Sequence, residues 1–348
     1  MNIFDLMRQS KSLILHGAEA RDALGLLEEE LSEALSLYWT TAQAILSGSG
    51  ITLLEKPEGF LKLENNFFSA LFLYSYHRAG IPRGRRVLYA ALNHCLRGMV
   101  TGCDNILDDE YKMTLETDLP AGARRFRSII DIMASDRTLF SLLMEAYAKN
   151  ELSSEQVLMA STASLHALTA SGIQESTEEQ GIQSILTPQD ILSKVHHYKT
   201  GLLFNCPWGI PAVLEKLSTD TVAPLQQALY RIGIGCQILD DMVDLGRDAR
   251  EARHNYAASL IYHGSDKDHW RQLQEKAEAE PGDQEKATLL LDFPPALEES
   301  AHVAQRYLLE GLTALFDEQH QFAVEPALAF LYRRIGTEHL MAAAGRPA

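Results

Sequence analysis

The chain has 348 residues, of which 46% are hydrophobic and 22% are charged, so it can bury a large core in one helical domain or two smaller ones. Its formal net charge of -16 at pH 7 leaves no basic surface for nucleic acid or for an anionic membrane, and we expect neither as a partner. No segment approaches the roughly 20 apolar residues of a membrane-spanning helix, so we expect no stable membrane insertion.

The N-terminal residues and the four cysteines predict a cytoplasmic protein. Residues 1–16 carry charges within their apolar pattern and lack the features of a secretory signal peptide. Cys95, Cys103, Cys206 and Cys236 fall inside apolar helical patterns rather than at disulfide or zinc spacings. We therefore expect four core thiols in a reducing compartment.

The spacing of apolar residues predicts an all-α protein, because they recur every three or four positions through most of the chain while β-branched alternation is rare. The expected helices span residues 22–46, 61–78, 85–111, 125–133, 137–149, 154–180, 188–217, 222–245, 250–262, 269–279, 296–316 and 326–341. The loops between them, including residues 280–285, are too short for a domain linker, and no solenoid repeat is present. We expect one large helical bundle over residues 1–348, with peripheral termini at 1–20 and 342–348.

Three aspartates lie four residues apart near residue 240. Asp240, Asp244 and Asp248 would form one row on a helix. Each pair of carboxylates at this spacing is mildly unfavourable and raises the pKa values of its members. The pattern therefore indicates a cation at this row.

A second acidic cluster, residues 104–110, follows a long apolar run. Asp104 and Asp108 share a helical face here as well, and Asp109 follows. Two such rows imply a pair that face each other. Oxygen ligands, without cysteine or histidine at ligand spacing, suit Mg²⁺. The alternative is that both clusters are solvated acidic helix ends.

Lys199 and Thr200 offer a cation and a hydroxyl beside Gly201, within the predicted helix 188–217. We expect Pro207 to kink or break this helix. The lysine is a candidate for phosphate binding, and the alternative is a surface lysine beside a packing glycine. Gln174 has two interpretations as well, a ligand contact or an ordinary polar residue of a helix.

These motifs resemble those of the trans-isoprenyl diphosphate synthase family and its relatives, the class I terpenoid synthases, a superfamily also described as polyprenyl synthetase-like. The resemblance is colinear over about residues 59–300. Residues 104–109 correspond to the first aspartate-rich motif and residues 172–174 to a Gly-Gln pair. Residues 199–201 correspond to a Lys-Thr motif and residues 237–244 to Gln-x-x-Asp-Asp-x-x-Asp.

The resemblance implies a helical bundle of the isoprenoid synthase type, with a central apolar cavity, three Mg²⁺ ions and an allylic prenyl diphosphate. The implied metal ligands are Asp104, Asp108, Asp109, Asp240, Asp244 and Asp248. The implied substrate-binding residues are Lys62, Met99, Val100, Gln174, Lys199, Thr200 and Gln237. Catalysis, by Asp104, Asp108, Lys199 and Asp240, would be ionisation, in which the metals and the lysine neutralise the leaving diphosphate and an apolar cavity excludes water. A homodimer is also implied.

Two basic motifs of the chain-elongating members are missing. Residues 59–66 keep Lys62 but have Glu64 among the former arginines, and residues 112–115 contain no arginine. A second diphosphate loses a charge-assisted contact with each missing guanidinium. Asn105 replaces the second aspartate of the first motif, which spares the pair Asp104 and Asp108, so metal binding should survive.

Our main prediction is a terpene synthase or cyclase that uses one substrate. The first alternative is a trans-prenyltransferase with a different acceptor, or one with replacement cations such as Arg83, Arg85, Arg86 or Arg124. The second alternative is a non-catalytic partner subunit.

The length of the prenyl tail depends on the residues before Asp104. Met99 and Val100 stand where bulky aromatic residues occur in short-chain members of the family, and Gly98 and Gly102 would leave further room. One more helical turn adds about 5 Å of depth, close to one isoprene unit. We therefore expect farnesyl or longer diphosphates as substrates.

Overall fold

The structure is a computed structural model that describes residues 17–109, 111–279 and 286–346. Helices and loops account for this part of the chain, apart from one isolated antiparallel bridge between Leu53 and Thr117. The all-α prediction is confirmed. The predicted absence of a signal peptide in residues 1–16 and the predicted loop 280–285 lie outside the described residues.

The chain divides into two compact units. Unit 1 comprises residues 1–168 and 206–222, and unit 2 comprises residues 169–205 and 223–348. The single-domain organisation stays a prediction.

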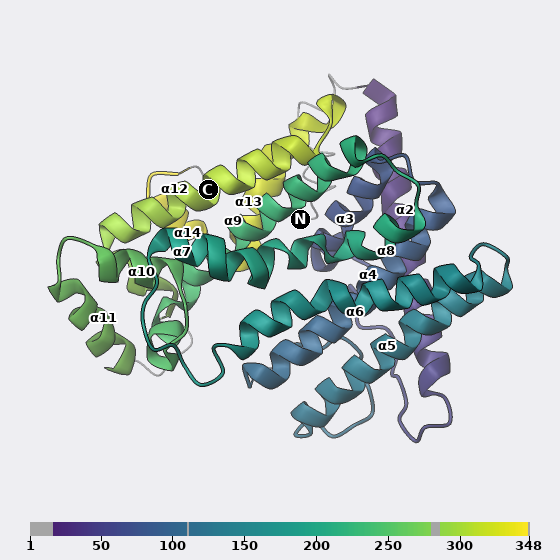
Figure 1. Ribbon diagram of the computed structural model, residues 1–348, viewed down its shortest axis with the longest axis horizontal. Helices are drawn as coiled ribbons and strands as arrows, with labels where there is room; N and C mark the ends of the chain where they lie inside the picture. The colour runs from purple at the N-terminus through teal and green to yellow at the C-terminus, as the bar shows by residue number, and fades with distance from the viewer. Residues whose placement is uncertain (1–16, 110, 280–285, 347–348) are drawn as a thin grey trace. The chain divides into compact units, whose positions relative to one another are not determined.

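Unit 1 contains the helices from α2 to α6 that are drawn in purple, blue and teal in Figure 1, except for the end of α6, and the green α8. They are α2 (Gly17–Leu46), η2 (Leu63–Asn66), α3 (Phe67–Arg78), α4 (Arg83–Leu107), α5 (Arg124–Ala148), most of α6 (Ser154–Ser176) and α8 (Gly209–Leu214). The sequence predicts two helices where α5 is continuous, because polar residues interrupt the apolar pattern near Ser135. Ser135 is buried and contacts the hydroxyl of Tyr38 on α2, so the interruption belongs to the core.

Two glycines allow α4 to lie close to α5. A Cβ atom on Gly102 would come within 2.6 Å of Ile132 Cγ1 and 2.9 Å of the Ser128 carbonyl oxygen, and one on Gly98 within 2.2 Å of Ser135 Oγ. The prediction that these glycines leave room for a prenyl tail is therefore wrong. Their missing side chains are replaced by the atoms of α5.

Asp131 is the one buried acidic residue of α5 among those described. Neither of its carboxylate oxygens has a hydrogen-bond partner of good geometry. Burial raises the pKa of Asp131 to about 7, although Thr114, the Leu115 N–H and Arg127 act in the opposite direction. Unit 1 thus contains a carboxylic acid that stays protonated up to a higher pH than an ordinary aspartate.

Unit 2 is built around the long helix α9 (Thr219–Glu251), whose first residues belong to unit 1. The other elements are α7 (Pro188–Asp190), η3 (Ile191–Gly201), α10 (Tyr256–His263), α11 (Asp268–Ala279), η5 (Lys286–Asp292), α12 (Pro294–Leu315), η6 (Glu318–Ala323), α13 (Val324–Ile335) and α14 (Glu338–Ala343). The sequence predicts an end at residue 245, but α9 continues through Asp248.

Glycines bring the backbone of α9 into contact with its neighbours. A Cβ atom on Gly233 would lie 2.8 Å from the Thr200 carbonyl oxygen of η3, and one on Gly235 would lie 3.1 Å from the Ala304 carbonyl oxygen of α12. Gly311 of α12 meets the Ala228 carbonyl oxygen of α9 at 2.8 Å in the same way. These contacts hold α9 between η3 and α12.

The predicted helix 188–217 is broken, as expected from Pro207. Residues 191–201 form the π-helix η3, and a short 3₁₀ segment, η4 (Leu203–Trp208), contains the proline before α8 begins. Proline lacks the amide hydrogen that a continuous helix requires. π-Helical turns are rare and frequently occur at functional sites.

The sequence predicts that the four cysteines lie in the core and that no helix spans a membrane. Cys95, Cys206 and Cys236 are buried free thiols as expected, but the free thiol of Cys103 is exposed. The reason is that α4 packs at this level through Gly98, Gly102 and Asn105, and position 103 lies off that face. None of the described helices combines the length and the apolar character needed to cross a membrane.

Candidate active site

The second acidic row lies on α9, within unit 2. Asp240, Asp244 and Asp248 follow one another at four-residue intervals along this continuous helix, as predicted. Solvent reaches the side chain of Asp240, but the surrounding protein and the carboxylates of Asp244 and Asp241 raise its pKa to about 7. The expected repulsion within the row is therefore present.

Part of the compensating charge comes from the chain itself. Arg247 forms an ion pair with Asp244, and its Nε lies 3.8 Å from Asp248 Oδ1. Asn255 Nδ2 donates a hydrogen bond of 2.8 Å to Asp248 Oδ2. Asp248 is buried, and burial raises its pKa well above the ordinary value. Its contacts make Asp248 a structural member of the row as well as a predicted ligand.

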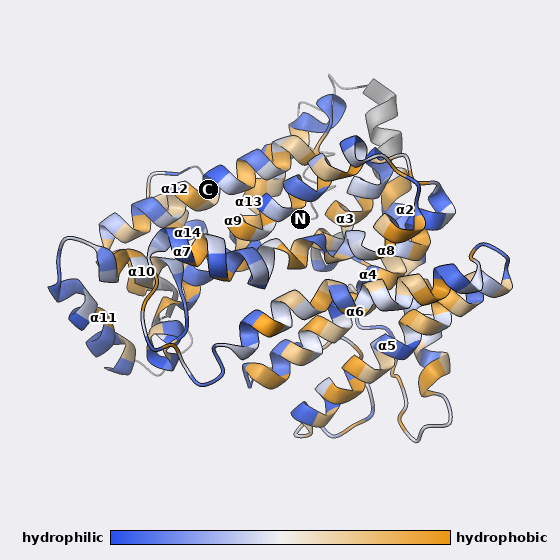
Figure 2. Ribbon diagram, viewed as in Figure 1, coloured by the Kyte–Doolittle hydropathy of each residue, from blue (hydrophilic) through white to orange (hydrophobic). Residues whose placement is uncertain are grey.

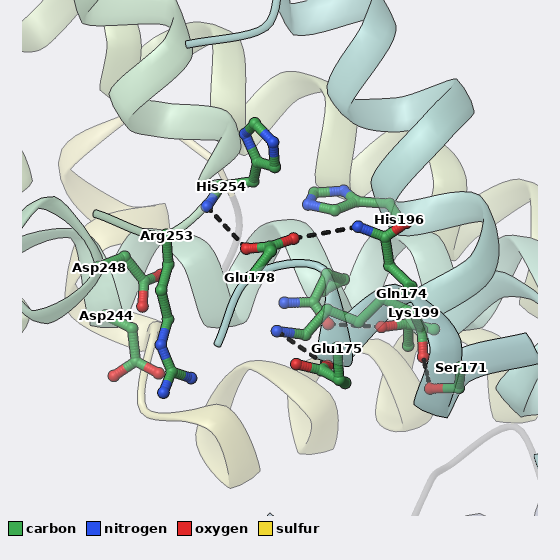
Figure 3. A network of polar contacts seen from close by, with 12 residues as sticks. Ser171, Gln174, Glu175, Glu178, His196, Lys199, Asp244, Asp248, Arg253 and His254 are labelled. Carbon is green, nitrogen blue, oxygen red and sulfur yellow. Dashed lines mark hydrogen bonds and ion pairs between the residues drawn. The ribbon is translucent and has the colours of Figure 1, made fainter. Parts of the chain in front are cut away.

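Lys199 of η3 lies among the carboxylates shown in Figure 3. Its Nζ is 3.1 Å from Glu175 Oε1, and its carbonyl oxygen accepts a hydrogen bond of 2.9 Å from the Ser171 hydroxyl. Burial would lower the pKa of Lys199, but the carboxylates of Glu175, Asp248 and Glu178 together raise it above the ordinary value. Lys199 is therefore a stable cation in the environment of the α9 row.

Thr200 and Gln237 belong to a buried network that connects η3 with α9. The Thr200 hydroxyl donates to Gln237 Oε1, and Gln237 Nε2 donates to Asp241 Oδ1 at 2.9 Å. Asp241 Oδ2 accepts the Tyr256 N–H at 2.6 Å and lies 2.9 Å from His196 Nε2. Sequence reasoning gave Asp241 no role of its own, because it resembles an ordinary neighbour of the motif residues.

Gln174 lies near the end of α6 and uses its side chain inside the protein. Its Nε2 donates to Glu178 Oε1 at 3.1 Å, while Glu178 Oε2 accepts the His254 N–H at 2.9 Å (Figure 3). Glu175 and Glu178, which the sequence analysis did not single out, thus connect α6 to Lys199 and to residue 254. Acidic residues directly after Gln174 and one helical turn beyond it would have been the signal.

The first acidic row lies in unit 1, where α4 ends. Asp104 is in the last turn, and Asp108 is the C-cap, whose N–H donates to the Asp104 carbonyl oxygen at 2.8 Å. The sequence predicts a helix to residue 111, but Asp109 already has a φ of 51°. Its carboxylate pairs at 3.3 Å with Arg125, and both side chains are exposed. Asp109 therefore leaves the helical row.

The region of the missing upstream motif is a hydrogen-bonded turn. Gly59 has a φ of 81°, and its carbonyl oxygen accepts a bond of 2.9 Å from Asn65 Nδ2. Asn66 Nδ2 donates to the carbonyl oxygen of Lys62, and Asn66 Oδ1 accepts from Arg97 Nη1 at 3.2 Å. Arg97 also donates to the Asn65 carbonyl oxygen at 3.0 Å. An arginine that the sequence analysis missed therefore reaches the turn that holds Lys62.

Three of the proposed replacement arginines are engaged elsewhere. Arg83 pairs with Glu33 at 2.7 Å, Arg85 with Glu215 at 2.9 Å, and the buried Arg86 with Glu30. These pairs connect the N-terminal end of α4 to its neighbours, and the use of these arginines as replacement cations stays a prediction. Met99 and Val100 are half-buried, and their role beside a prenyl tail stays a prediction.

The donors of both rows suit Mg²⁺ by chemistry, because all are carboxylate oxygens. Among the residues that the structure describes, no three carboxylate, imidazole or thiol side chains converge on one point. Metal binding by Asp104, Asp108, Asp109, Asp240, Asp244 and Asp248 stays a prediction, as does the opposition of the two rows.

Comparison with known proteins supports the resemblance. Residues 123–259 match the family model described as polyprenyl synthetase, and a comparison with curated proteins found no match. A polyprenyl synthase from Roseobacter denitrificans is 20% identical, with a TM-score of 0.57 and coverage of 90% of this chain and 99% of that one.

Two further solved structures have the same fold. A geranylgeranyl pyrophosphate synthase from Lactobacillus brevis is 15% identical, with a TM-score of 0.60 and coverage of 94% and 99% of the two chains. A polyprenyl synthase from Caulobacter crescentus, complexed with calcium and isoprenyl diphosphate, is 14% identical, with a TM-score of 0.58 and coverage of 88% and 97%. The fold class and the resemblance to this superfamily are confirmed.

Proposed function

We propose that this chain, a protein of the isoprenoid synthase fold with a polyprenyl synthetase segment, is a trans-prenyltransferase that acts on an allylic prenyl diphosphate. The observation that carries the proposal is the placement of Lys199 and Thr200 beside α9 in unit 2, where Thr200 is hydrogen-bonded to Gln237 and the Asp248 carboxylate helps to raise the pKa of Lys199. The family match includes both elements. It favours the transferase, our first alternative, over the terpene synthase that was our main prediction from sequence.

The acidic rows would hold Mg²⁺, through Asp104 and Asp108 in unit 1 and Asp240 and Asp244 in unit 2. The ions, three by resemblance, would supply positive charge to the leaving diphosphate. Lys199 would bind a diphosphate oxygen, because its ammonium group is held among carboxylates that keep it protonated. Gln237 and Asp241 would hold η3 in register with α9, so that Lys199 stays close enough to Asp240 to lower the pKa of that carboxyl.

A second anionic substrate needs cationic side chains where it binds. The presence of Arg97 supports such a binding site. The guanidinium of Arg97 is tied to Asn65 and Asn66, and Asn66 also binds the backbone of Lys62. Both basic side chains are exposed at this turn. Arg97 and Lys62 would together bind the acceptor diphosphate.

The terpene synthase remains a second candidate because of Asn65. This side chain is neutral and is hydrogen-bonded to the Gly59 carbonyl oxygen, at a position where the family has a basic motif. One-substrate chemistry would need no cation there.

One assay separates these functions. The protein is incubated with Mg²⁺ and geranyl, farnesyl or geranylgeranyl diphosphate, with and without isopentenyl diphosphate. Longer diphosphates formed only with the second substrate support the transferase, and hydrocarbon formed without it supports the synthase. No turnover with any combination would support the non-catalytic subunit.

A matched pair of variants tests the acceptor site. Arg97→Ala should raise the KM for isopentenyl diphosphate about tenfold or more, as expected for loss of a charged hydrogen bond, and leave the KM for the allylic substrate unchanged. Arg83→Ala, which removes an exposed arginine from the same helix, is the control. Equal effects of both variants would contradict the role of Arg97.

Our proposal for the allylic substrate is farnesyl diphosphate or a longer prenyl diphosphate.

Our proposal for the assembly is a homodimer. Unit 1 has large exposed apolar side chains on α5 and α6, where Figure 2 shows apolar residues along both helices; they are Phe126, Ile129, Met133, Phe140, Met144, Tyr147, Leu158, Met159 and Leu165. Exposed apolar surface of this kind supports association between copies. Light scattering after gel filtration measures the mass, and a monomer at micromolar concentration would contradict the proposal.

A further inference from the structure

Asn105 lies between the two aspartates of the first row and makes two hydrogen bonds to one backbone position. Its Nδ2 donates to the Lys112 carbonyl oxygen at 2.9 Å, and its Oδ1 accepts the Lys112 N–H at 2.7 Å. Only 2% of Asn105 is exposed. Both polar atoms of the side chain are therefore used inside the protein.

An amide can make this pair of bonds, and an ionised aspartate cannot. A carboxamide has a donor and an acceptor, whereas an ionised carboxylate has acceptors alone. An ionised aspartate at residue 105 could accept the Lys112 N–H, but its second oxygen would face the Lys112 carbonyl oxygen without a hydrogen between them. The asparagine is thus suited to this contact, and it is not merely an aspartate that has lost its charge.

The segment that follows Lys112 is fixed at its far end. Arg127 of α5 donates to the carbonyl oxygens of Thr117 and Leu119 at 3.2 and 3.1 Å. The Leu54 N–H donates to the Glu116 carbonyl oxygen at 2.8 Å. Asn105 joins the near end of this segment to the last turn of α4.

We propose that Asn105 is a positioning residue that fixes the path of the chain after Asp108 and thereby holds Asp104 and Asp108 as a pair. The helix ends at Leu107, and Asp109 already has a left-handed backbone, so Asp108 stands where the chain turns away. The two bonds to Lys112 fix the position of the backbone at residue 112 relative to the last turn of α4. The role toward a metal ion rests on the proposed function, whereas the restraint on the chain does not.

The test compares Asn105→Asp, which is nearly isosteric, with Asn105→Leu, which removes both bonds. Hydrogen exchange of residues 108–117 is measured by mass spectrometry in metal-free protein. The Mg²⁺ concentration for half-maximal turnover is measured in parallel. Asn150→Asp adds a carboxylate at an exposed site of unit 1 and serves as the control.

We expect exchange of this segment to be about tenfold faster in Asn105→Asp, the change that corresponds to one hydrogen bond of ordinary strength, and faster still in Asn105→Leu. The Mg²⁺ concentration for half-maximal turnover should rise in the same order, while the KM for the allylic diphosphate at saturating Mg²⁺ stays constant. Asn150→Asp should change neither quantity.

Two results would overturn the proposal. One is a lower Mg²⁺ requirement in Asn105→Asp, which would identify residue 105 as a weakened metal ligand. The other is unchanged exchange of residues 108–117 in the Asp variant at alkaline pH, where its carboxyl is ionised. Should the wild-type protein turn over no allylic diphosphate, the proposed function fails, and the exchange data still decide whether Asn105 restrains the chain. If Asn105→Leu does not fold, circular dichroism reveals it and the Asp variant alone decides.

Discussion

The two acidic rows have the same spacing but different surroundings. In unit 1, Asp104 and Asp108 stand at the end of α4, and an asparagine between them binds the returning backbone. In unit 2, the row lies inside the 33 residues of α9, next to Arg247 and Lys199. The first row is defined by the path of the chain, and the second by a network of charges.

Two buried aspartates, one from each unit, differ in the same way. Asp241 in unit 2 accepts hydrogen bonds from Gln237 and from the Tyr256 N–H. Asp131 in unit 1 has no hydrogen-bond partner of good geometry. A buried carboxylate stabilises a fold when its oxygens are paired and opposes it when they are not. The comparison shows that the effect of a carboxylate on the stability of this fold depends on its hydrogen-bond partners and not on its spacing in the sequence.

The largest expected effect is on turnover. Asp240→Ala and Asp104→Ala should each reduce kcat at least about a hundredfold, because loss of one contact that stabilises developing charge costs about that much. Circular dichroism should show an unchanged helical content. Since both rows are expected to act through Mg²⁺, excess chelator should abolish wild-type turnover, and persistent turnover in chelator would refute this account.

The second largest effect is on stability, and it distinguishes two neighbouring residues of α9. Asp241→Ala should lower the free energy of unfolding by about 3 kcal/mol, because it leaves His196 and Gln237 without their buried carboxylate. Asp240→Ala should change it little, since Asp240 is solvent-exposed and repelled by its neighbours. Urea unfolding followed by circular dichroism measures both, and equal losses would show that the two residues share one role.

Packing of α4 against α5 in unit 1 gives the third prediction. Gly102→Ala should cost about 1–3 kcal/mol of stability, because the new methyl group meets Ile132 and the Ser128 carbonyl oxygen. Gly84→Ala lies in the same helix with no atom within 4 Å of its Cβ and is the control. A neutral Gly102→Ala variant with altered chain-length preference would instead restore the view of this glycine as part of the tail cavity.

Asp131 gives a pH-dependent prediction. Its pKa is about 7 in the folded state and 3.8 by the ordinary value, so the folded protein binds the proton more tightly than the unfolded chain. This carboxyl therefore costs stability increasingly as the pH rises from about 4 to about 7. Asp131→Asn should be more stable than wild type at pH 8, by on the order of 2 kcal/mol, and should lose this advantage near pH 4.

Asp136→Asn, an exposed position on α5, should give the same difference from wild type at every pH. Thermal unfolding between pH 4 and 8 measures both variants. A wild-type advantage at pH 8 would mean that the Asp131 carboxylate is paired in solution.

The smallest expected effect concerns substrate length. If Val100 lies beside the prenyl tail, Val100→Phe should shift the ratio of geranyl to geranylgeranyl turnover by about tenfold, since pocket discrimination by size is of that order. Met133→Phe on the exposed face of α5 is the control. An unchanged ratio for Val100→Phe would place the end of the cavity elsewhere.

Patterns of spacing were sufficient to predict several features. The helical class, the break at Pro207 and the row on α9 all follow from periodicity or from proline chemistry. Lys199 was also identified, because a lysine, a hydroxyl and a glycine in succession form a local pattern. Local patterns are carried by neighbouring residues, and the sequence displays them directly.

Features that depend on tertiary partners were missed. The sequence cannot distinguish Asp240 from Asp241, since adjacent residues point about 100° apart on a helix and only packing decides which one is buried. Gly98 and Gly102 were interpreted as empty space, whereas α5 fills it. Asn105 was interpreted as a lost aspartate because Lys112, its partner, lies seven residues away.

The glycine contacts of α9 limit which substitutions an engineered library could retain. Gly233 and Gly235 each lie against backbone oxygen atoms of another element, and no rotamer change can relieve contact with a carbonyl group. Exposed positions of the same helix, such as Arg250, carry no such restriction. A selection for altered products that randomises α9 should therefore return both glycines in nearly every active clone. Variation would accumulate on faces of the helix where side chains alone make the contacts.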